Sequence, residues 1–87
     1  MTASYSLKII TPKGIAYSGT AVHAEVPVEN GYVGILPNHA SYLVASNGGK
    51  ITARESNGTE RGFKVGAGFF EINQNQAVFL TQSCQSL

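Results

Sequence analysis

The chain has 87 residues, of which 43% are hydrophobic, and six basic residues against five acidic ones give it a formal net charge of +1. So short a chain predicts a single domain over residues 1–87. Its near-neutral charge excludes the basic surface that grips phosphates, so we expect no nucleic-acid partner. One cysteine, Cys84, excludes an internal disulfide, and no apolar run approaches the roughly 20 residues that cross a bilayer.

Short apolar segments alternate with turn residues along the whole sequence. In chain order, the segments expected to be strands include residues 7–10, 15–17, 20–28, 32–36, 40–45, 51–55, 60–65, 69–72 and 77–80. Asn30-Gly31 and Asn57-Gly58 are typical hairpin turns, and no segment holds the 3.6-residue apolar period of a helix. The pattern predicts an all-β fold, an antiparallel β-sandwich of about ten short strands in two sheets.

The strand over residues 20–28 alternates with a period of two. Its valines should face the core, while His23 and Glu25 should face solvent or an interface. Among the aromatic side chains, we predict that Phe69, Phe70 and Phe79 belong to the core. Tyr42 fits either the core or a contact surface.

The sequence shows no catalytic or metal-binding constellation. His23 and His39 have no second ligand at a metal-binding spacing, and Ser41 beside His39 lacks the orienting carboxylate of a triad. Gly48-Gly49-Lys50 is not a phosphate loop, because Ile51 stands where Ser or Thr should follow the lysine. We therefore expect a protein that is not an enzyme and holds no cofactor or metal.

Two residues have both a structural and a functional interpretation. His39 follows Pro37-Asn38, so it either caps a turn by hydrogen bonding to the backbone or contacts a partner from an exposed loop. Tyr32 alternates with Val33, so one of the two faces outward, and an exposed tyrosine beside glycines suits an interface anchor.

Residues 31–40, GYVGILPNHA, carry the most informative motif, and it closely resembles the signature of the epsilon subunit of F-type ATP synthases. Other motifs of that family are matched in order by YSG at 17–19, the strand at 22–28, GGKI at 48–51, GAGFFEI at 66–72 and VFLT at 78–81. The resemblance runs from about residue 5 to about residue 83. Departures are modest: Ser41 replaces the proline usual after His-Ala, and Tyr32 stands where a polar or acidic residue is frequent.

The resemblance implies a non-catalytic rotor subunit of the central stalk. It would bind the gamma subunit and rest on the c-ring, and would couple proton translocation to ATP synthesis in the catalytic head. By position, the c-ring contact loop would be Glu29, Asn30, Gly31, Tyr32 and Val33, and the gamma contact would be Pro37, His39, Ser41 and Tyr42. The chain would be a monomer within a hetero-oligomeric complex, held peripherally by its partners at the cytoplasmic face of the bacterial inner membrane or an equivalent energy-coupling membrane.

Many members of the family continue into a C-terminal helical hairpin that inhibits ATP hydrolysis and in some members binds ATP. The sequence ends at Leu87, before that segment, so we expect neither property of these residues. Two other functions remain open on sequence alone. A carbohydrate- or peptide-binding module should show clustered exposed aromatic residues, and a lipoyl or biotinyl carrier should show a lysine at a hairpin tip, where Asn30-Gly31 and Asn57-Gly58 stand instead.

Overall fold

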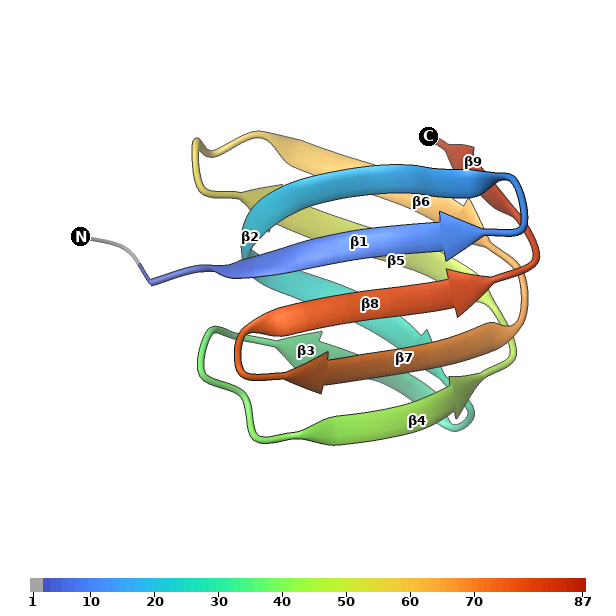
Figure 1. Ribbon diagram of the computed structural model, residues 1–87, viewed down its shortest axis with the longest axis horizontal. Helices are drawn as coiled ribbons and strands as arrows, with labels where there is room; N and C mark the ends of the chain where they lie inside the picture. Colours follow the sequence, from blue (N-terminus) through green and yellow to red (C-terminus); the bar gives the residue numbers. More distant parts are fainter. Residues whose placement is uncertain (1–2) are drawn as a thin grey trace.

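The computed structural model describes residues 3–87, and their regular secondary structure is entirely β (Figure 1). No helix among these residues is long and apolar enough to cross a membrane. The strands in chain order are β1 Tyr5–Thr11, β2 Gly14–Val28, β3 Gly31–Ile35, β4 Tyr42–Ser46, β5 Gly49–Glu55, β6 Glu60–Val65, β7 Gly68–Asn73, β8 Gln76–Thr81 and β9 Cys84–Ser86.

These strands form two facing layers that belong to one hydrogen-bonded sheet. The strand order is β4-β7-β8-β1-β2-β5-β6-β9, with β3 also paired to β2. Neighbours are antiparallel except β1 and β8, which run parallel. β2 joins the layers, because its first half pairs with β1 and its second half with β3 and β5. Figure 1 shows β1, β8, β7 and β4 in front of β3, β5 and β6. The predicted all-β sandwich is confirmed, but we expected two antiparallel sheets, whereas the two layers belong to one sheet and the β1–β8 pair is parallel.

Strand β2 differs from the prediction in its length and in which of its residues face the core. We expected separate strands over residues 15–17 and 20–28, but the structure has one strand of 15 residues. Its register against β5 shifts between Ala21 and His23. Because such an irregularity changes which side chains face inward, Ala21 is buried before the shift and Ala24 and Val26 are buried after it. The valine face is therefore buried only in the second half of the strand, where Glu25 is exposed.

The core lies between the two layers and includes the predicted aromatic pair, Phe70 and Phe79, both fully buried. The prediction for Phe69 was wrong, since 57% of this residue is exposed. It precedes Phe70 on the same strand, and adjacent residues of a strand point to opposite sides. The other buried apolar residues are Tyr5, Leu7, Ile9, Ala21, Ala24, Val26, Ile35, Ile51, Ala53, Phe63, Val65, Ile72 and Ala77.

One contact joins the two layers, and another brings two strands of the front layer close together. The Tyr5 hydroxyl donates a buried hydrogen bond of 2.9 Å to the Ile35 carbonyl, which joins β1 to the end of β3. Gly68 lies so close to β8 that a Cβ there would stand 1.8 Å from the Leu80 carbonyl oxygen. The second glycine of the GAGFFEI motif is thus required by the approach of two backbones.

Candidate partner-binding surfaces

The hairpin between β2 and β3 presents the residues predicted to contact a c-ring. Glu29, Asn30 and Gly31 are exposed, while Val33 packs against the core. Tyr32 is 59% exposed and projects from the outer side of β3, where its hydroxyl accepts a 3.4 Å hydrogen bond from the Lys50 amide. The residues predicted to contact the c-ring therefore lie together at the start of β3.

The loop between β3 and β4 holds the predicted gamma contacts. Pro37, His39 and Tyr42 are half-buried, and Ser41 is exposed. His39 Nδ1 lies 2.7 Å from the Ala40 carbonyl, so this nitrogen carries the hydrogen and donates it. The His39 and Tyr42 rings are 5.6 Å apart at 48°. The predicted backbone bond of His39 is confirmed, and its contact with a partner stays a prediction.

The two predicted contact groups lie at opposite ends of the molecule. In Figure 1, the β2–β3 turn is at the right-hand end, and the β3–β4 loop is at the left-hand end beside the β7–β8 turn. Strand β3 spans the distance between them.

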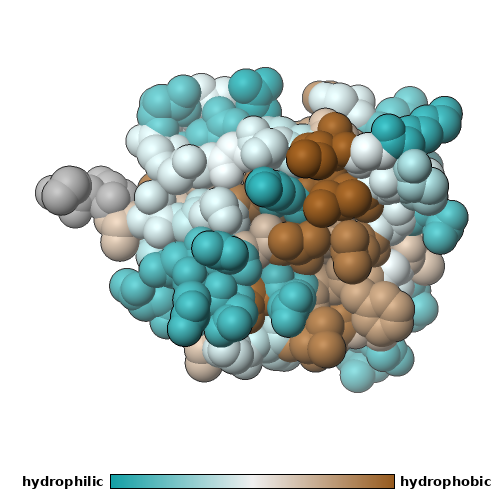
Figure 2. All heavy atoms as spheres, viewed as in Figure 1, coloured by the Kyte–Doolittle hydropathy of each residue, from teal (hydrophilic) through white to brown (hydrophobic). Residues whose placement is uncertain are grey.

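A row of apolar side chains crosses the outer side of the front layer. Phe69, Leu80 and Ile15 are exposed, and Ala45 and Ile10 are half-buried. Ala45 pairs with Phe69, Phe69 with Leu80, Leu80 with Ile10, and Ile10 with Ile15, so the row runs over β4, β7, β8, β1 and β2. Figure 2 shows apolar side chains gathered on this face of the molecule. We call these five residues the apolar row.

Neighbouring side chains extend the apolar row on both sides. Leu43, 68% exposed, and Val78 lie in the adjacent row, which also contains Glu71 and Lys8. On the other side, Pro12 joins residues of the row in lining a shallow groove of about 320 Å³. Exposed apolar surface of this extent is typical of a protein-binding site.

The apolar row was not predicted from the sequence, although a signal for it exists. Ile9-Ile10, Phe69-Phe70 and Phe79-Leu80 are adjacent apolar pairs within single strands. One member of each pair faces the core, so the other must face outward.

The outer side of the back layer is polar. His23 and Arg54 are cross-strand partners, as are Glu25 and Thr52, and Lys50 stands opposite Lys64. Arg54 also lies 3.6 Å from the Glu60 carboxylate. We call this surface, together with Tyr32, the polar face. Tyr32 and Phe69 are on different strands of different layers, so these two exposed aromatic residues do not form the platform of a carbohydrate site.

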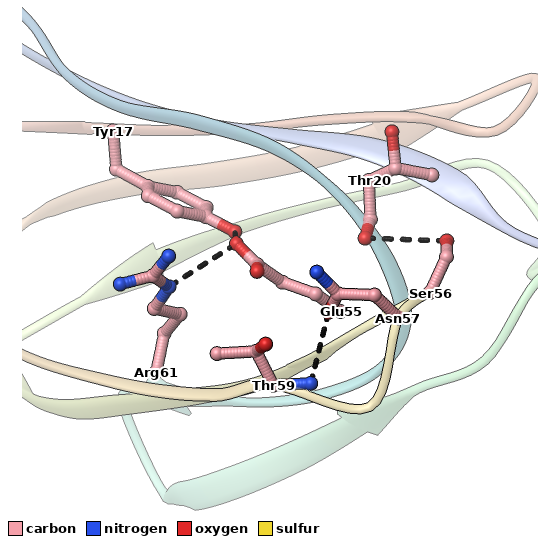
Figure 3. A network of polar contacts seen from close by, with 7 residues as sticks. All are labelled: Tyr17, Thr20, Glu55, Ser56, Asn57, Thr59 and Arg61. Atoms are coloured by element: carbon pink, nitrogen blue, oxygen red, sulfur yellow. Dashed lines mark hydrogen bonds and ion pairs between the residues drawn. The ribbon is translucent and has the colours of Figure 1, made fainter.

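A polar network fastens the β5–β6 hairpin to β2 (Figure 3). The Tyr17 hydroxyl donates a 2.5 Å hydrogen bond to Glu55 Oε2, which Arg61 Nε also approaches to 3.3 Å. Tyr17 packs on Phe63 with ring centres 4.8 Å apart. A Cβ on Gly19 would stand 2.2 Å from the Tyr17 hydroxyl oxygen, so glycine at this position makes room for the tyrosine. This explains the YSG motif by packing.

The network shifts the pKa values of its members. The pKa of Tyr17 rises to about 12, first because burial penalises the phenolate and then because the hydroxyl bonds to Glu55. The pKa of Glu55 is lowered, chiefly by the hydrogen bond from Tyr17 against an opposing effect of burial, with further help from Arg61. Among residues 3–87, no group of three or more His, Cys, Asp or Glu side chains could hold a metal ion. The network links β2 to the β5–β6 hairpin.

Comparison with known proteins decides the family. The sequence profile of the ATP synthase Delta/Epsilon chain, beta-sandwich domain, matches residues 4–86. The chain belongs to this Delta/Epsilon family. Its members include the ATP synthase epsilon chain of Chlorobaculum tepidum, 34% identical over 79 residues that make up 91% of this chain and 90% of the relative. The epsilon chain of Moorella thermoacetica is 31% identical over 83 residues, or 95% of this chain and 62% of the relative.

Solved structures show the same fold. A chain of the Euglena gracilis mitochondrial ATP synthase (OSCP/F1/c-ring, rotational state 1) superimposes with a TM-score of 0.89 at 14% identity. This match covers 97% of the present chain and 54% of the Euglena chain, so the present chain spans about half of its neighbour. A chain of the Tetrahymena thermophila mitochondrial ATP synthase central stalk and c-ring gives a TM-score of 0.75 at 12% identity. The β-sandwich fold of this chain thus recurs in these chains at low identity.

Proposed function

We propose that the chain is the epsilon subunit in the central stalk of an F-type ATP synthase. In this role it catalyses nothing, binds the gamma subunit and the c-ring, and turns with them as proton flow drives ATP synthesis in the catalytic head. Membership of the Delta/Epsilon family supports the role. The observation that carries it is the apolar row, because a sandwich with one outer side exposed as apolar surface needs a partner to cover that side.

We assign the apolar row and the β3–β4 loop to the gamma subunit. β4 links them, since Tyr42 at its start packs beside His39 and Ala45 further along belongs to the row. β4 also has only β7 as its neighbour, so a partner on the row can reach the loop along this edge of the sheet. Large apolar side chains at the centre of an interface contribute most of its binding free energy.

We assign the hairpin of Glu29, Asn30, Gly31, Tyr32 and Val33 to the c-ring. It lies at the end of β3 opposite the β3–β4 loop, so both partners can be bound at once. The subunit is a single sandwich domain and a monomer within the complex. The close-packed interior suits the transmission of torque, because it is poorly compressible. Its partners hold it at the cytoplasmic face of a bacterial inner membrane or an equivalent energy-coupling membrane.

The test compares two aromatic residues with nearly equal exposure. Phe69 in the apolar row is 57% exposed and Tyr32 on the polar face is 59% exposed. Binding of each serine variant to purified gamma subunit would be measured by calorimetry. Phe69→Ser should weaken binding by about 30-fold, which corresponds to an interface hot spot of roughly 2 kcal/mol. Tyr32→Ser should bind gamma like the unmodified chain.

Equal effects of the two variants would contradict the assignment of the apolar row to gamma. Failure of the unmodified chain to bind folded gamma would overturn the proposed function itself. Circular dichroism of both variants provides the control, because exposed side chains contribute little to folding and both variants should remain folded.

A further inference from the structure

We infer that Asn75 is a positioning residue, which clamps the β3–β4 loop from the β7–β8 turn and so holds His39 ready for its partner. Nothing in the sequence analysis singled out Asn75. The inference rests on the proposed function, since it concerns the loop assigned to the gamma subunit. Asn75 would act on gamma binding indirectly, by holding the β3–β4 loop.

The clamp is a reciprocal pair of hydrogen bonds between two asparagines that lie 37 positions apart. The Asn38 backbone amide donates to Asn75 Oδ1 at 2.7 Å, and Asn75 Nδ2 donates to Asn38 Oδ1 at 3.0 Å. Both residues have left-handed backbones, with φ of 65° at Asn38 and 60° at Asn75. Asparagine tolerates this conformation better than most residues, and its amide provides a donor and an acceptor together.

A second contact joins the same two segments. The Ser41 hydroxyl donates a 2.8 Å hydrogen bond to Asn73 Oδ1 at the end of β7. The loop is thus held near both of its ends by side chains of one turn. Ser41 is the residue that departs from the proline usual at this position of the family.

The β7–β8 turn is a firm support, whereas the loop has little support of its own. The Asn75 carbonyl accepts a 2.9 Å hydrogen bond from the Ser6 amide, and β7 and β8 are flanked by β4 and β1 in the sheet. Outside the strand ladders of residues 3–87, no backbone–backbone hydrogen bond involves residues 36–41. The conformation of the loop therefore depends on side-chain bonds.

The position of His39 follows from the clamp. His39 comes directly after Asn38, and its Nδ1 donates a hydrogen bond to the Ala40 carbonyl. Its Nε2 is therefore the ring nitrogen left for a partner. Holding the loop in one conformation before binding reduces the ordering that association would otherwise require. The clamp should thus raise affinity without touching the partner.

The experiment replaces neighbouring turn residues that share an unusual backbone. Asn75→Gly removes both amide bonds while glycine accepts the positive φ, and Gln74→Gly is the matched control, with φ of 50° at the native residue. For both variants, exchange of the Asn38 amide hydrogen and affinity for gamma would be measured. Asn75→Gly should speed exchange and weaken gamma binding, each by on the order of tenfold, while Gln74→Gly changes neither.

Asn75→Asp is the conservative variant, because its carboxylate still accepts from the Asn38 amide but cannot donate. It should fall between Asn75→Gly and the unmodified chain. Unchanged amide exchange in Asn75→Gly would overturn the clamp. Faster exchange with unchanged gamma affinity would overturn the link between the loop and the partner, while a loss of affinity in Phe69→Ser would still support the proposed function.

Discussion

The two outer sides of the sandwich share one core yet differ in chemistry. The front layer carries the apolar row of Ala45, Phe69, Leu80, Ile10 and Ile15 on its outer side, whereas the polar face carries charged and hydroxyl side chains. Both layers follow the same alternation of inward and outward residues. The difference lies in which residues occupy the outward positions, so the outer surface can vary while the inward residues specify the fold.

The largest predicted effect separates the inside of the front layer from its outside. Phe70 is fully buried and its neighbour Phe69 is exposed. Phe70→Ala should lower the free energy of unfolding by about 3–5 kcal/mol, because it removes buried area and leaves a cavity. Phe69→Ala should change it by less than about 0.5 kcal/mol. Urea denaturation of both variants measures the difference.

Comparable losses in the two variants would mean that Phe69 packs into the folded chain, and the apolar row would then lose its status as a free surface. Because the two residues are adjacent and chemically identical, differences in helix or strand propensity cannot account for the expected contrast.

A second prediction tests the end of the polar face assigned to the c-ring. Tyr32→Asp places a carboxylate where we propose an interface, and an uncompensated charge there should cost about 2 kcal/mol or more, or roughly 30-fold in affinity for the c-ring. Proton-driven ATP synthesis by the assembled enzyme in vesicles should fall in consequence. Gln85→Asp, at an exposed position of β9, is the control and should have no effect. Undiminished synthesis with Tyr32→Asp would refute the contact.

The smallest predicted effect concerns the network of Tyr17, Glu55 and Arg61. The folded-state pKa of Glu55 is lowered. Its contribution to the free energy of unfolding is therefore present above about pH 4.3, the ordinary pKa of glutamate, and is lost as the pH falls through the lowered pKa. The pKa of Tyr17 is raised, so this residue contributes to stability below about pH 10 and loses the contribution as the pH rises toward about 12.

Denaturation at a series of pH values from about 7 down to about 3 therefore distinguishes Tyr17→Phe from the unmodified chain. The variant should start less stable at neutral pH and lose less stability on acidification, because the hydrogen bond that lowers the Glu55 pKa is gone. Tyr42→Phe, whose hydroxyl is not part of the network, is the control. Parallel curves for Tyr17→Phe and the unmodified chain would show that Glu55 is not coupled to Tyr17.

Much of the fold follows from local sequence rules. Turn residues and period-two segments located most strands to within one or two residues, and residues 60–65 matched β6 in full. Phe70 and Phe79 were correctly predicted in the core. The short β9 was missed, since Cys84–Ser86 has little apolar character and forms a strand by pairing with β6. The motif at residues 31–40 was correctly identified, but no local pattern indicated that Asn75 would bond to it, because the two segments meet only in the tertiary structure.

The sequence by itself determined the strand class, the turns and the family, because these depend on short-range periodicity and on motifs readable in order. The tertiary structure decided three further properties: β2 joins both layers, β1 pairs in parallel with β8, and residues from five strands align into the apolar row. Each depends on the register between segments distant in the chain. Register is set by packing of the common core, and a shift of one residue would turn every outward side chain inward.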